Sequence, residues 1–169
     1  MRLVTRMAVL SLTAGVALVA APRPGLAARR ATAARSAQYE AGFEKALIQP
    51  QQLLKEMNGP KNERPIVLQV GFEVLYRGAH IPGAIYAGPA FRPEGLANLR
   101  RAAARIPRDH LVVIYCGCCP MSKCPNIHPA YAAMRKMGFR RLQVLNLPED
   151  FAHDWVAKGL PIVKGDSPR

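Results

Sequence analysis

The sequence predicts a single α/β domain with a mostly parallel central sheet flanked by helices on both faces. Short apolar runs at residues 65–70, 84–86, 111–115 and 142–145 alternate with stretches of helical spacing. Such alternation is typical of a parallel sheet whose connecting helices cover both of its faces. Half of the 169 residues are hydrophobic, which is enough for one buried core.

The beginning of the chain is predicted to be a signal peptide, residues 1–27, rather than part of the fold. Arg2 and Arg6 make its start positive, residues 7–21 form an apolar run, and Ala27 precedes the expected cleavage site. The run is shorter than the roughly 20 residues that span a bilayer, so we expect no stable membrane span after cleavage. The mature protein is therefore expected in the periplasm or outside the cell. An uncleaved membrane anchor is the alternative.

The domain itself is predicted at residues 48–163, between two short extensions. Residues 28–47 are predicted to be a flexible N-terminal extension, because residues 28–37 are rich in Ala and Arg and show no apolar period. Residues 39–48 could form a short amphipathic helix at its end. Residues 164–169 are predicted to be a C-terminal tail.

Proline and glycine mark the predicted helices of the domain. Proline suits the first turn of a helix, and glycine suits the position just past its end. On these signals and on apolar spacing, helices are predicted at residues 50–57, 93–105, 129–137 and 151–158. The third of these follows the strand at 111–115 through a cysteine-rich loop. That loop therefore leaves the carboxyl end of a strand, where open α/β sheets bind ligands.

The four cysteines of the chain, Cys116, Cys118, Cys119 and Cys124, all lie in this loop. A disulfide framework spreads its cysteines along the chain so that they join distant segments. Cysteines confined to one loop cannot do this, so they indicate a functional site instead.

Three stretches of the chain resemble, in order, the rhodanese-like domain family. They are the strand and turn at residues 67–70 and 78–84, the strand and cysteine at 112–116, and the tail at 137–162, and the resemblance covers about residues 48–163. It implies a small α/β domain that transfers sulfane sulfur without an organic cofactor. A cysteine, Cys116 by position, takes sulfur from a small anionic donor such as thiosulfate, becomes a persulfide and passes the sulfur to a thiol acceptor or to cyanide.

The cysteine-rich loop departs from the pattern of the family, which is C-x-x-G-x-R-[ST]. Cys119 stands at the glycine, Met121 stands at the arginine, and only Ser122 keeps its type. The acidic residue that usually follows the first strand is Gln69 here. Efficient use of thiosulfate is therefore not expected. The absence of a loop arginine also disfavours phosphatase and arsenate chemistry, which need a two-pronged clamp on the anion.

The predicted nucleophile Cys116 must ionise, because a cysteine attacks as its thiolate. Inward-facing backbone N–H groups of the loop can stabilise that anion and the persulfide that follows, and the start of the next helix adds a positive dipole end. The residues predicted to share this role are Gly117, Cys118, Cys119, Ser122 and Lys123.

The additional cysteines leave a second class of function open, a non-enzymatic thiol redox or metal-binding module. Cys119 or Cys124 could resolve a persulfide or a mixed disulfide formed on Cys116. The alternative metal site would use Cys116, Cys119, Cys124 and His128 to bind zinc or copper(I). A local disulfide between two of the cysteines is the structural alternative.

The net charge of +13 would permit binding to nucleic acid or to an acidic surface. The basic residues are scattered, and an exported protein does not meet nucleic acid, so we expect no nucleic-acid partner. A positive field would also attract anionic substrates. No phosphate-binding glycine loop occurs in the sequence, so no organic cofactor is expected. Protein partners are not indicated.

Overall fold

The computed structural model describes residues 25–166 of the chain. Within them, a five-stranded sheet has the order β1-β5-β4-β2-β3, and all its paired strands are parallel. The predicted α/β architecture with a parallel sheet is thereby confirmed. The strands are β1 Leu47–Ile48, β2 Ile66–Gln69, β3 Ile85–Tyr86, β4 Val112–Tyr115 and β5 Leu142–Leu145.

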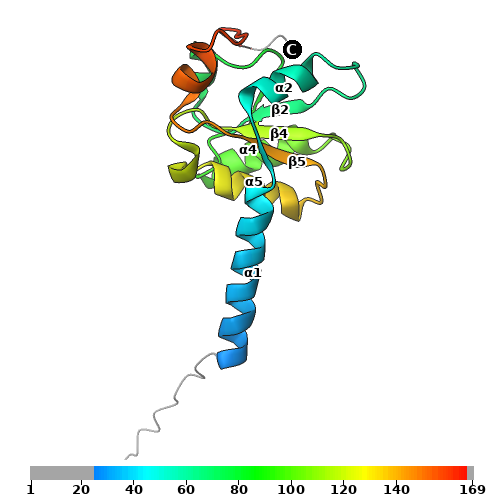
Figure 1. The fold of residues 1–169 in the computed structure, drawn as a ribbon, viewed down its shortest axis with the longest axis vertical. Coiled ribbons are helices and arrows are strands. Elements are labelled where there is room, and N and C mark those ends of the chain that lie inside the picture. The colour runs from blue at the N-terminus through cyan, green and yellow to red at the C-terminus, as the bar shows by residue number, and fades with distance from the viewer. Residues whose placement is uncertain (1–24, 167–169) are drawn as a thin grey trace, which may run out of the picture. The chain divides into compact units, whose positions relative to one another are not determined.

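Helices cover both faces of this sheet, with α4 and α5 on one side and α2 on the other (Figure 1). Of these three helices, α2 and α4 begin at a proline, and α5 begins at the buried Ile127. The helices are α1 Leu26–Glu44, α2 Pro50–Met57, α3 Glu73–Gly78, α4 Pro93–Ala103 and α5 Ile127–Lys136, with a 3-10 turn η1 at Met121–Lys123 and a π-helical turn η2 at Ala152–Val156.

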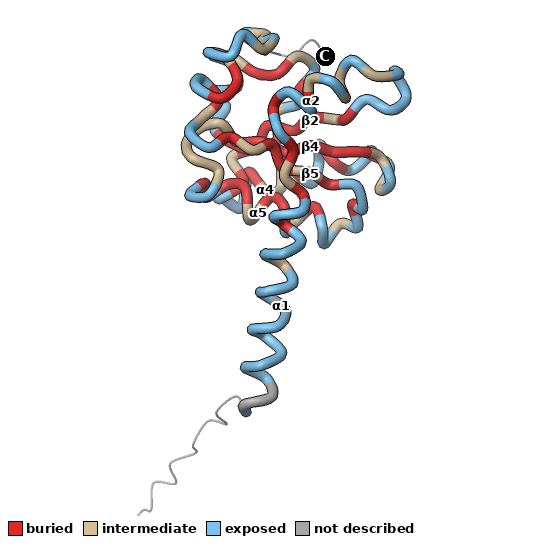
Figure 2. The backbone as a smooth tube through the Cα atoms, viewed as in Figure 1, coloured by how far each residue is buried: buried red, intermediate tan, exposed pale blue. Residues whose placement is uncertain are grey.

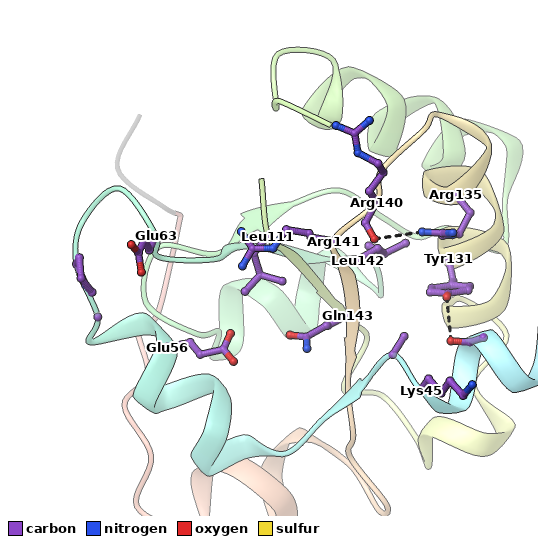
Figure 3. Close-up of a pocket in the computed structure, with 14 residues that line it drawn as sticks. Lys45, Glu56, Glu63, Leu111, Tyr131, Arg135, Arg140, Arg141, Leu142 and Gln143 are labelled. Atoms are coloured by element: carbon purple, nitrogen blue, oxygen red, sulfur yellow. Dashed lines mark hydrogen bonds between the residues drawn. The ribbon is translucent and has the colours of Figure 1, made fainter. Parts of the chain in front are cut away.

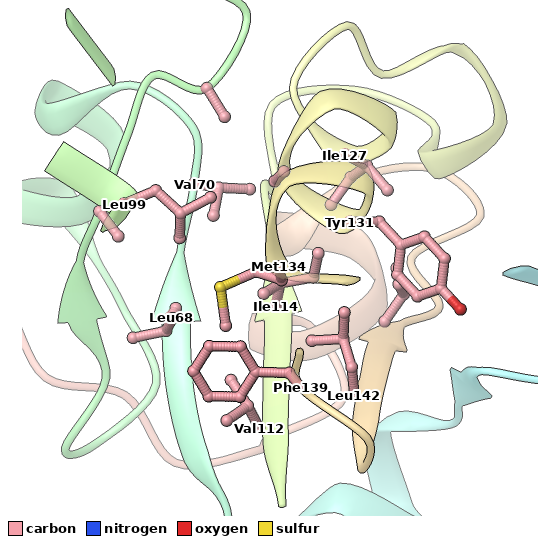
Figure 4. Close-up of a cluster of buried hydrophobic side chains, with 14 of the residues drawn as sticks. Leu68, Val70, Leu99, Val112, Ile114, Ile127, Tyr131, Met134, Phe139 and Leu142 are labelled. Atoms are coloured by element: carbon pink, nitrogen blue, oxygen red, sulfur yellow. The ribbon is translucent and has the colours of Figure 1, made fainter. Parts of the chain in front are cut away.

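The core lies around the central strands, which are largely buried (Figure 2). Their side chains alternate between the two faces of the sheet. Val112 and Ile114 of β4 pack towards α4 and α5, whereas Val113 and Tyr115 pack towards the opposite layer. Figure 4 shows Met134 of α5 among the side chains of the first layer. A strand that is buried on both faces needs apolar residues at every position. The sequence therefore shows β4 as an unbroken run of apolar residues.

The N-terminal extension differs from its prediction. Residues 26–44 form the single helix α1, although residues 28–37 show no apolar period, because Ala and Arg are both strong helix formers. The short helix predicted at 39–48 is the end of α1, and β1 follows it. Phe43 is buried, and the compact unit of the structure reaches back to Ala37, before the predicted start of the domain at residue 48.

The predicted signal peptide lies outside the described residues, apart from its last three. Gly25 precedes α1, and the expected cleavage point after Ala27 falls in the first turn of that helix. In the described part of the chain, no helix is both long enough and apolar enough to cross a membrane.

Candidate active site around Cys116

Cys116 follows β4 directly, so the cysteine-rich loop does leave the carboxyl end of a central strand. The neighbouring strand β2 positions it. The Gln69 side chain donates a hydrogen bond from Nε2 to the Cys116 carbonyl oxygen at 3.0 Å. A Cβ atom at Gly71 would lie 2.8 Å from the Cys116 sulfur, so only glycine leaves room for the thiol at that point. The end of β2 thus fixes both the backbone and the side chain of Cys116.

Gly117 turns the chain away from the strand immediately after Cys116. Its φ of +80° lies in the left-handed region that favours glycine. The Phe151 backbone N–H donates to the Gly117 carbonyl at 3.2 Å, and the Met121 N–H donates to the Leu147 carbonyl at 3.0 Å. The loop is therefore held against the segment that follows β5.

The loop and the start of α5 bring all four thiols together. The Sγ atoms of Cys116 and Cys118 lie 3.2 Å apart, as do those of Cys118 and Cys119. The sulfurs of Cys116, Cys118 and Cys124 lie within 4.8 Å of one another, and all four cysteines are free thiols. The turn η1 therefore brings Cys124 back beside Cys116, although eight positions separate the two residues in the sequence.

Asn126 is a site residue that the sequence prediction missed. Its side chain is fully buried, and its Nδ2 atom donates to the Cys116 sulfur at 3.4 Å. The Phe91 backbone N–H donates to its Oδ1 atom at 3.0 Å. A backbone N–H can only donate, so this contact fixes the amide oxygen towards Phe91 and the amide nitrogen towards the sulfur. The helix was predicted to begin only at Pro129, which hid the position of Asn126 just before α5.

The surroundings of the thiol cluster favour ionisation of Cys124 over that of Cys116. The hydrogen bond from the Cys116 thiol lowers the pKa of Cys124, and backbone N–H groups of Asn126 and Ile127 at the start of α5 add to the effect, so that it falls to about 5 despite burial. The same hydrogen bond, together with burial and the Cys124 charge, raises the pKa of Cys116. The helix N–H groups that were predicted to favour ionisation of Cys116 therefore act on its neighbour Cys124.

The two sides of Cys116 differ in access. On one side, a cavity of about 340 Å³ opens between α3, the cysteine loop and η2, and Cys116 and Cys118 line it. On the other side, Cys116 packs with Cys119 and Cys124, and the side chains leave no room for a water-sized molecule. Cys116 therefore reaches the open cavity together with Cys118, while Cys124, whose pKa is lowered, lies on the enclosed side.

The walls of the open cavity are mainly apolar. Asp150 lies at its edge, and the His153 backbone N–H lowers the pKa of that carboxyl, so it is charged at neutral pH. None of the described residues lining the cavity is a lysine or an arginine. The apolar wall residues are Val74, Leu75, Ala79, Phe151, Ala152 and Val156.

A larger and more basic cavity, of about 610 Å³, lies at the other end of the strands (Figure 3). Arg135, Arg140 and Arg141 line it together with Glu56 and Glu63. Ligands of open α/β sheets bind at the carboxyl ends of strands, and this cavity meets the amino end of β5. The basic side chains therefore gather away from the thiols.

Three predicted site residues lie apart from the sulfur cluster. Ser122 and Lys123 are exposed on η1 and do not line the cavity beside Cys116. The His128 ring stacks on Phe43, with the ring centres 4.5 Å apart. The set of thiols that could hold a soft metal ion is therefore Cys116, Cys118 and Cys124, rather than the predicted set with Cys119 and His128.

A thiol at the carboxyl end of a central parallel strand, beside an open cavity, defines an α/β protein with a cysteine-centred site. The chain belongs to the rhodanese-like domain family, whose model matches residues 49–151. The family resemblance found in the sequence motifs is thereby confirmed.

Solved structures with the same fold come from several bacteria. They include the BH2092 protein of Bacillus halodurans, at 18% identity and a TM-score of 0.54, covering 80% of this chain and 86% of that chain. Another is the polysulfide-sulfur transferase homodimer of Wolinella succinogenes, at 16% identity and a TM-score of 0.51, covering 80% and 91%. A third is the Alr3790 protein of Anabaena sp., at 19% identity and a TM-score of 0.51, covering 69% and 91%. No curated protein matches the chain.

Titration of the reduced protein is expected to show one thiolate that forms with a midpoint near pH 5, the pKa of Cys124. Because the folded pKa is below the ordinary value of 9.0, the ionised thiol stabilises the fold fully only above pH 9.0, and this contribution is lost as the pH falls through about 5. Ultraviolet absorbance of the thiolate measures the titration, and denaturant unfolding at several pH values measures the stability. Cys124→Ser should remove the transition, and a wild-type midpoint near 9.0 would contradict the assignment.

Asn126→Ala is expected to slow alkylation of Cys116 about tenfold, because a hydrogen bond to a charged group contributes roughly 1.5–3 kcal/mol. The pH profile of alkylation should also move to higher pH, since the amide no longer favours the ionised sulfur. Alkylation rates measured across a pH series by mass spectrometry test both effects. Asn58→Ala, at the exposed end of α2, is the matched control and should change neither. If the alkylation rate and its pH profile are unchanged in Asn126→Ala, the Asn126 amide does not stabilise the ionised Cys116 sulfur.

Proposed function

We propose that the protein is a sulfurtransferase or persulfide carrier in which Cys116 accepts sulfane sulfur and passes it to a thiol or another nucleophile. One observation carries the proposal: Cys116 is the member of the coupled thiol pair that lines the open cavity. Membership of the rhodanese-like family supports it. So does the shared fold of the Wolinella succinogenes polysulfide-sulfur transferase.

In the proposed reaction, Cys124 first acts as the base. The two thiols share a hydrogen bond, so the Cys116 proton can pass to the Cys124 sulfur and leave a thiolate on the accessible side. That thiolate attacks the sulfane sulfur of the donor, a new S–S bond forms on Cys116, and the rest of the donor leaves as an anion. The Cys118 backbone N–H and the Asn126 amide donate to the Cys116 sulfur and hold the persulfide in place.

The cavity favours a donor that carries an apolar group and little negative charge. Its walls offer apolar side chains, and no described lining residue is a lysine or an arginine that could bind a dianion such as thiosulfate. Organic persulfides and aryl thiosulfonates combine one negative charge with an apolar group. The donor class proposed here is therefore an organic sulfane-sulfur compound.

Benzenethiosulfonate is expected to load Cys116 at least about tenfold faster than thiosulfate at equal concentration, because burying the ring in an apolar cavity contributes a few kcal/mol. Loading by each donor is measured as the sum of cyanolysable sulfur on the initially reduced protein and sulfide released from it. Equal or faster loading from thiosulfate would refute the proposed donor class. No loading from either donor would refute the sulfurtransferase proposal.

A second candidate function, binding of a soft metal ion, is favoured by the three sulfurs that lie within 4.8 Å of one another. Elemental analysis of the purified reduced protein, combined with the sulfur-uptake assay, distinguishes metal binding from sulfur transfer. One zinc or copper per chain without sulfur uptake would favour metal binding. Sulfur uptake by metal-free protein would favour sulfur transfer.

We also propose that the protein acts outside the cytoplasm, on the basis of the leader-like residues 1–27. Cell fractionation with N-terminal sequencing of the mature chain tests this. A mature protein that begins near Ala28 in the periplasm or medium is expected, and full-length protein in the cytoplasm would refute export.

A further inference from the structure

Cys116 separates two environments, which gives its sulfur two distinct directions of approach. A donor molecule can reach it from the open cavity, where Cys118 is its neighbour. On the opposite side, the space shared with Cys124 has no room for a water-sized molecule. A sulfane sulfur loaded onto Cys116 therefore extends into the open cavity, and the enclosed side remains occupied by protein thiols.

Cys124 is fixed behind Cys116 by the start of α5. Its own backbone N–H donates to the Met121 carbonyl at 3.2 Å, which sets the position of its side chain. Backbone N–H groups of Asn126 and Ile127 donate to its sulfur. That sulfur hydrogen-bonds to the Cys116 thiol and lies within 4.8 Å of its sulfur. A nucleophilic sulfur is thus held on the enclosed side.

We propose that Cys124 is a resolving thiol: it attacks the Cys116 sulfur of the persulfide from the enclosed side and expels sulfide into the open cavity. Displacement at sulfur places the attacking and leaving atoms on opposite sides of the sulfur that is attacked, and the two faces of Cys116 provide this arrangement. The inference rests on the proposed loading of Cys116. It extends that function to a reductive step, in which the protein converts sulfane sulfur to sulfide.

The step balances without any further oxidant. Cys124 gives up its proton, its thiolate forms a bond to the Cys116 sulfur, and the persulfide S–S bond breaks; the departing sulfide takes up a proton from water in the open cavity. The products are HS⁻ and a Cys116–Cys124 disulfide, so two thiols are oxidised by two electrons and the sulfane sulfur is reduced. A dithiol reductant must then reduce the disulfide. Its thiolate can reach Cys116 through the open cavity.

The other two cysteines are less suited to this role. Cys118 lines the open cavity, on the same side as the leaving sulfide. The Cys119 sulfur hydrogen-bonds to those of Cys118 and Cys124, but it does not belong to the group of three sulfurs within 4.8 Å that includes Cys116.

The experiment treats reduced full-length protein with one equivalent of benzenethiosulfonate, a donor that releases a sulfinate and no thiol. Sulfide therefore arises only if a protein thiol resolves the persulfide. Trypsin cleaves after Lys123 and separates the Cys124 peptide from the peptide that holds Cys116, Cys118 and Cys119. Free sulfide and the peptides of a non-reducing digest are measured for the wild type, Cys124→Ser and the matched control Cys119→Ser.

The wild type and Cys119→Ser are expected to release one sulfide per chain and to yield the two peptides joined by a disulfide. Cys124→Ser should release at least tenfold less sulfide and keep the added sulfur on the Cys116 peptide. If Cys124→Ser retains the persulfide and the other two proteins do not, the result supports both the loading of Cys116 and its resolution by Cys124. Persulfide in all three proteins without sulfide overturns the resolving role and leaves sulfur loading intact. Wild-type rates of sulfide release from Cys124→Ser also overturn it. Neither sulfide nor added sulfur in any protein overturns loading itself.

Discussion

Cys116→Ser is expected to abolish sulfur uptake, lowering the loading rate by at least about 1,000-fold, because loss of a catalytic nucleophile removes the covalent pathway. A serine hydroxyl cannot form the persulfide and does not ionise near neutral pH. The rate at which benzenethiosulfonate releases benzenesulfinate measures the effect, whether or not the persulfide is later resolved.

The control for this variant is Cys119→Ser, which removes a thiol of the same loop outside the open cavity. It should load sulfur at the wild-type rate. Because Cys116 is buried in the core cluster, the fold of both variants is checked by thermal unfolding. Sulfur loading of folded Cys116→Ser at the wild-type rate would show that another thiol receives the sulfur.

Gly71→Ala is expected to lower the loading rate about 100-fold, since displacement of a catalytic group by about 1 Å can cost that much. An added Cβ atom would lie 2.8 Å from the Cys116 sulfur, 2.9 Å from the Cys116 carbonyl oxygen and 3.0 Å from Gln69 Nε2. Two of these contacts are with the end of β4, which the sheet holds in place, so the thiol must move. Loading kinetics together with the circular dichroism of the folded variant test this expectation.

Gly42→Ala is the matched control, because Gly42 lies in α1 and an added Cβ there would meet only the Tyr131 hydroxyl, at 4.0 Å. It should retain wild-type loading. If Gly71→Ala also loads at the wild-type rate while folded, the end of β2 does not set the position of Cys116.

The sheet and most of its helices were predictable because their residues carry local signals. The strand β5 and the helix α2 have the bounds that the sequence predicted, since apolar runs and proline at a first turn are read within a few residues. The short helix α3 was missed because only Tyr76 in it is buried, so it shows no apolar period. The strand β1 was missed because two residues are too few to show alternation.

The candidate site was predictable in its location but not in its electrostatics. The position of Cys116 follows from β4 and from the family motifs. The contact of Asn126 with the sulfur depends on the Phe91 N–H, which comes from a distant segment, so no local spacing reveals it. The pKa of Cys124 is lowered in part because α5 begins at Ile127, and one turn of helix decides which thiol the backbone N–H groups reach.

The most direct test asks which thiol gains the first sulfur. Reduced wild-type protein is mixed with benzenethiosulfonate, quenched by alkylation before sulfide appears, and digested with trypsin, which cleaves between Cys116 and Cys124 after Lys123. Peptide fragmentation is expected to place one added sulfur atom on Cys116 and none on Cys124. First appearance of the added sulfur on the Cys124 peptide would contradict the division between an accessible thiol and an enclosed one.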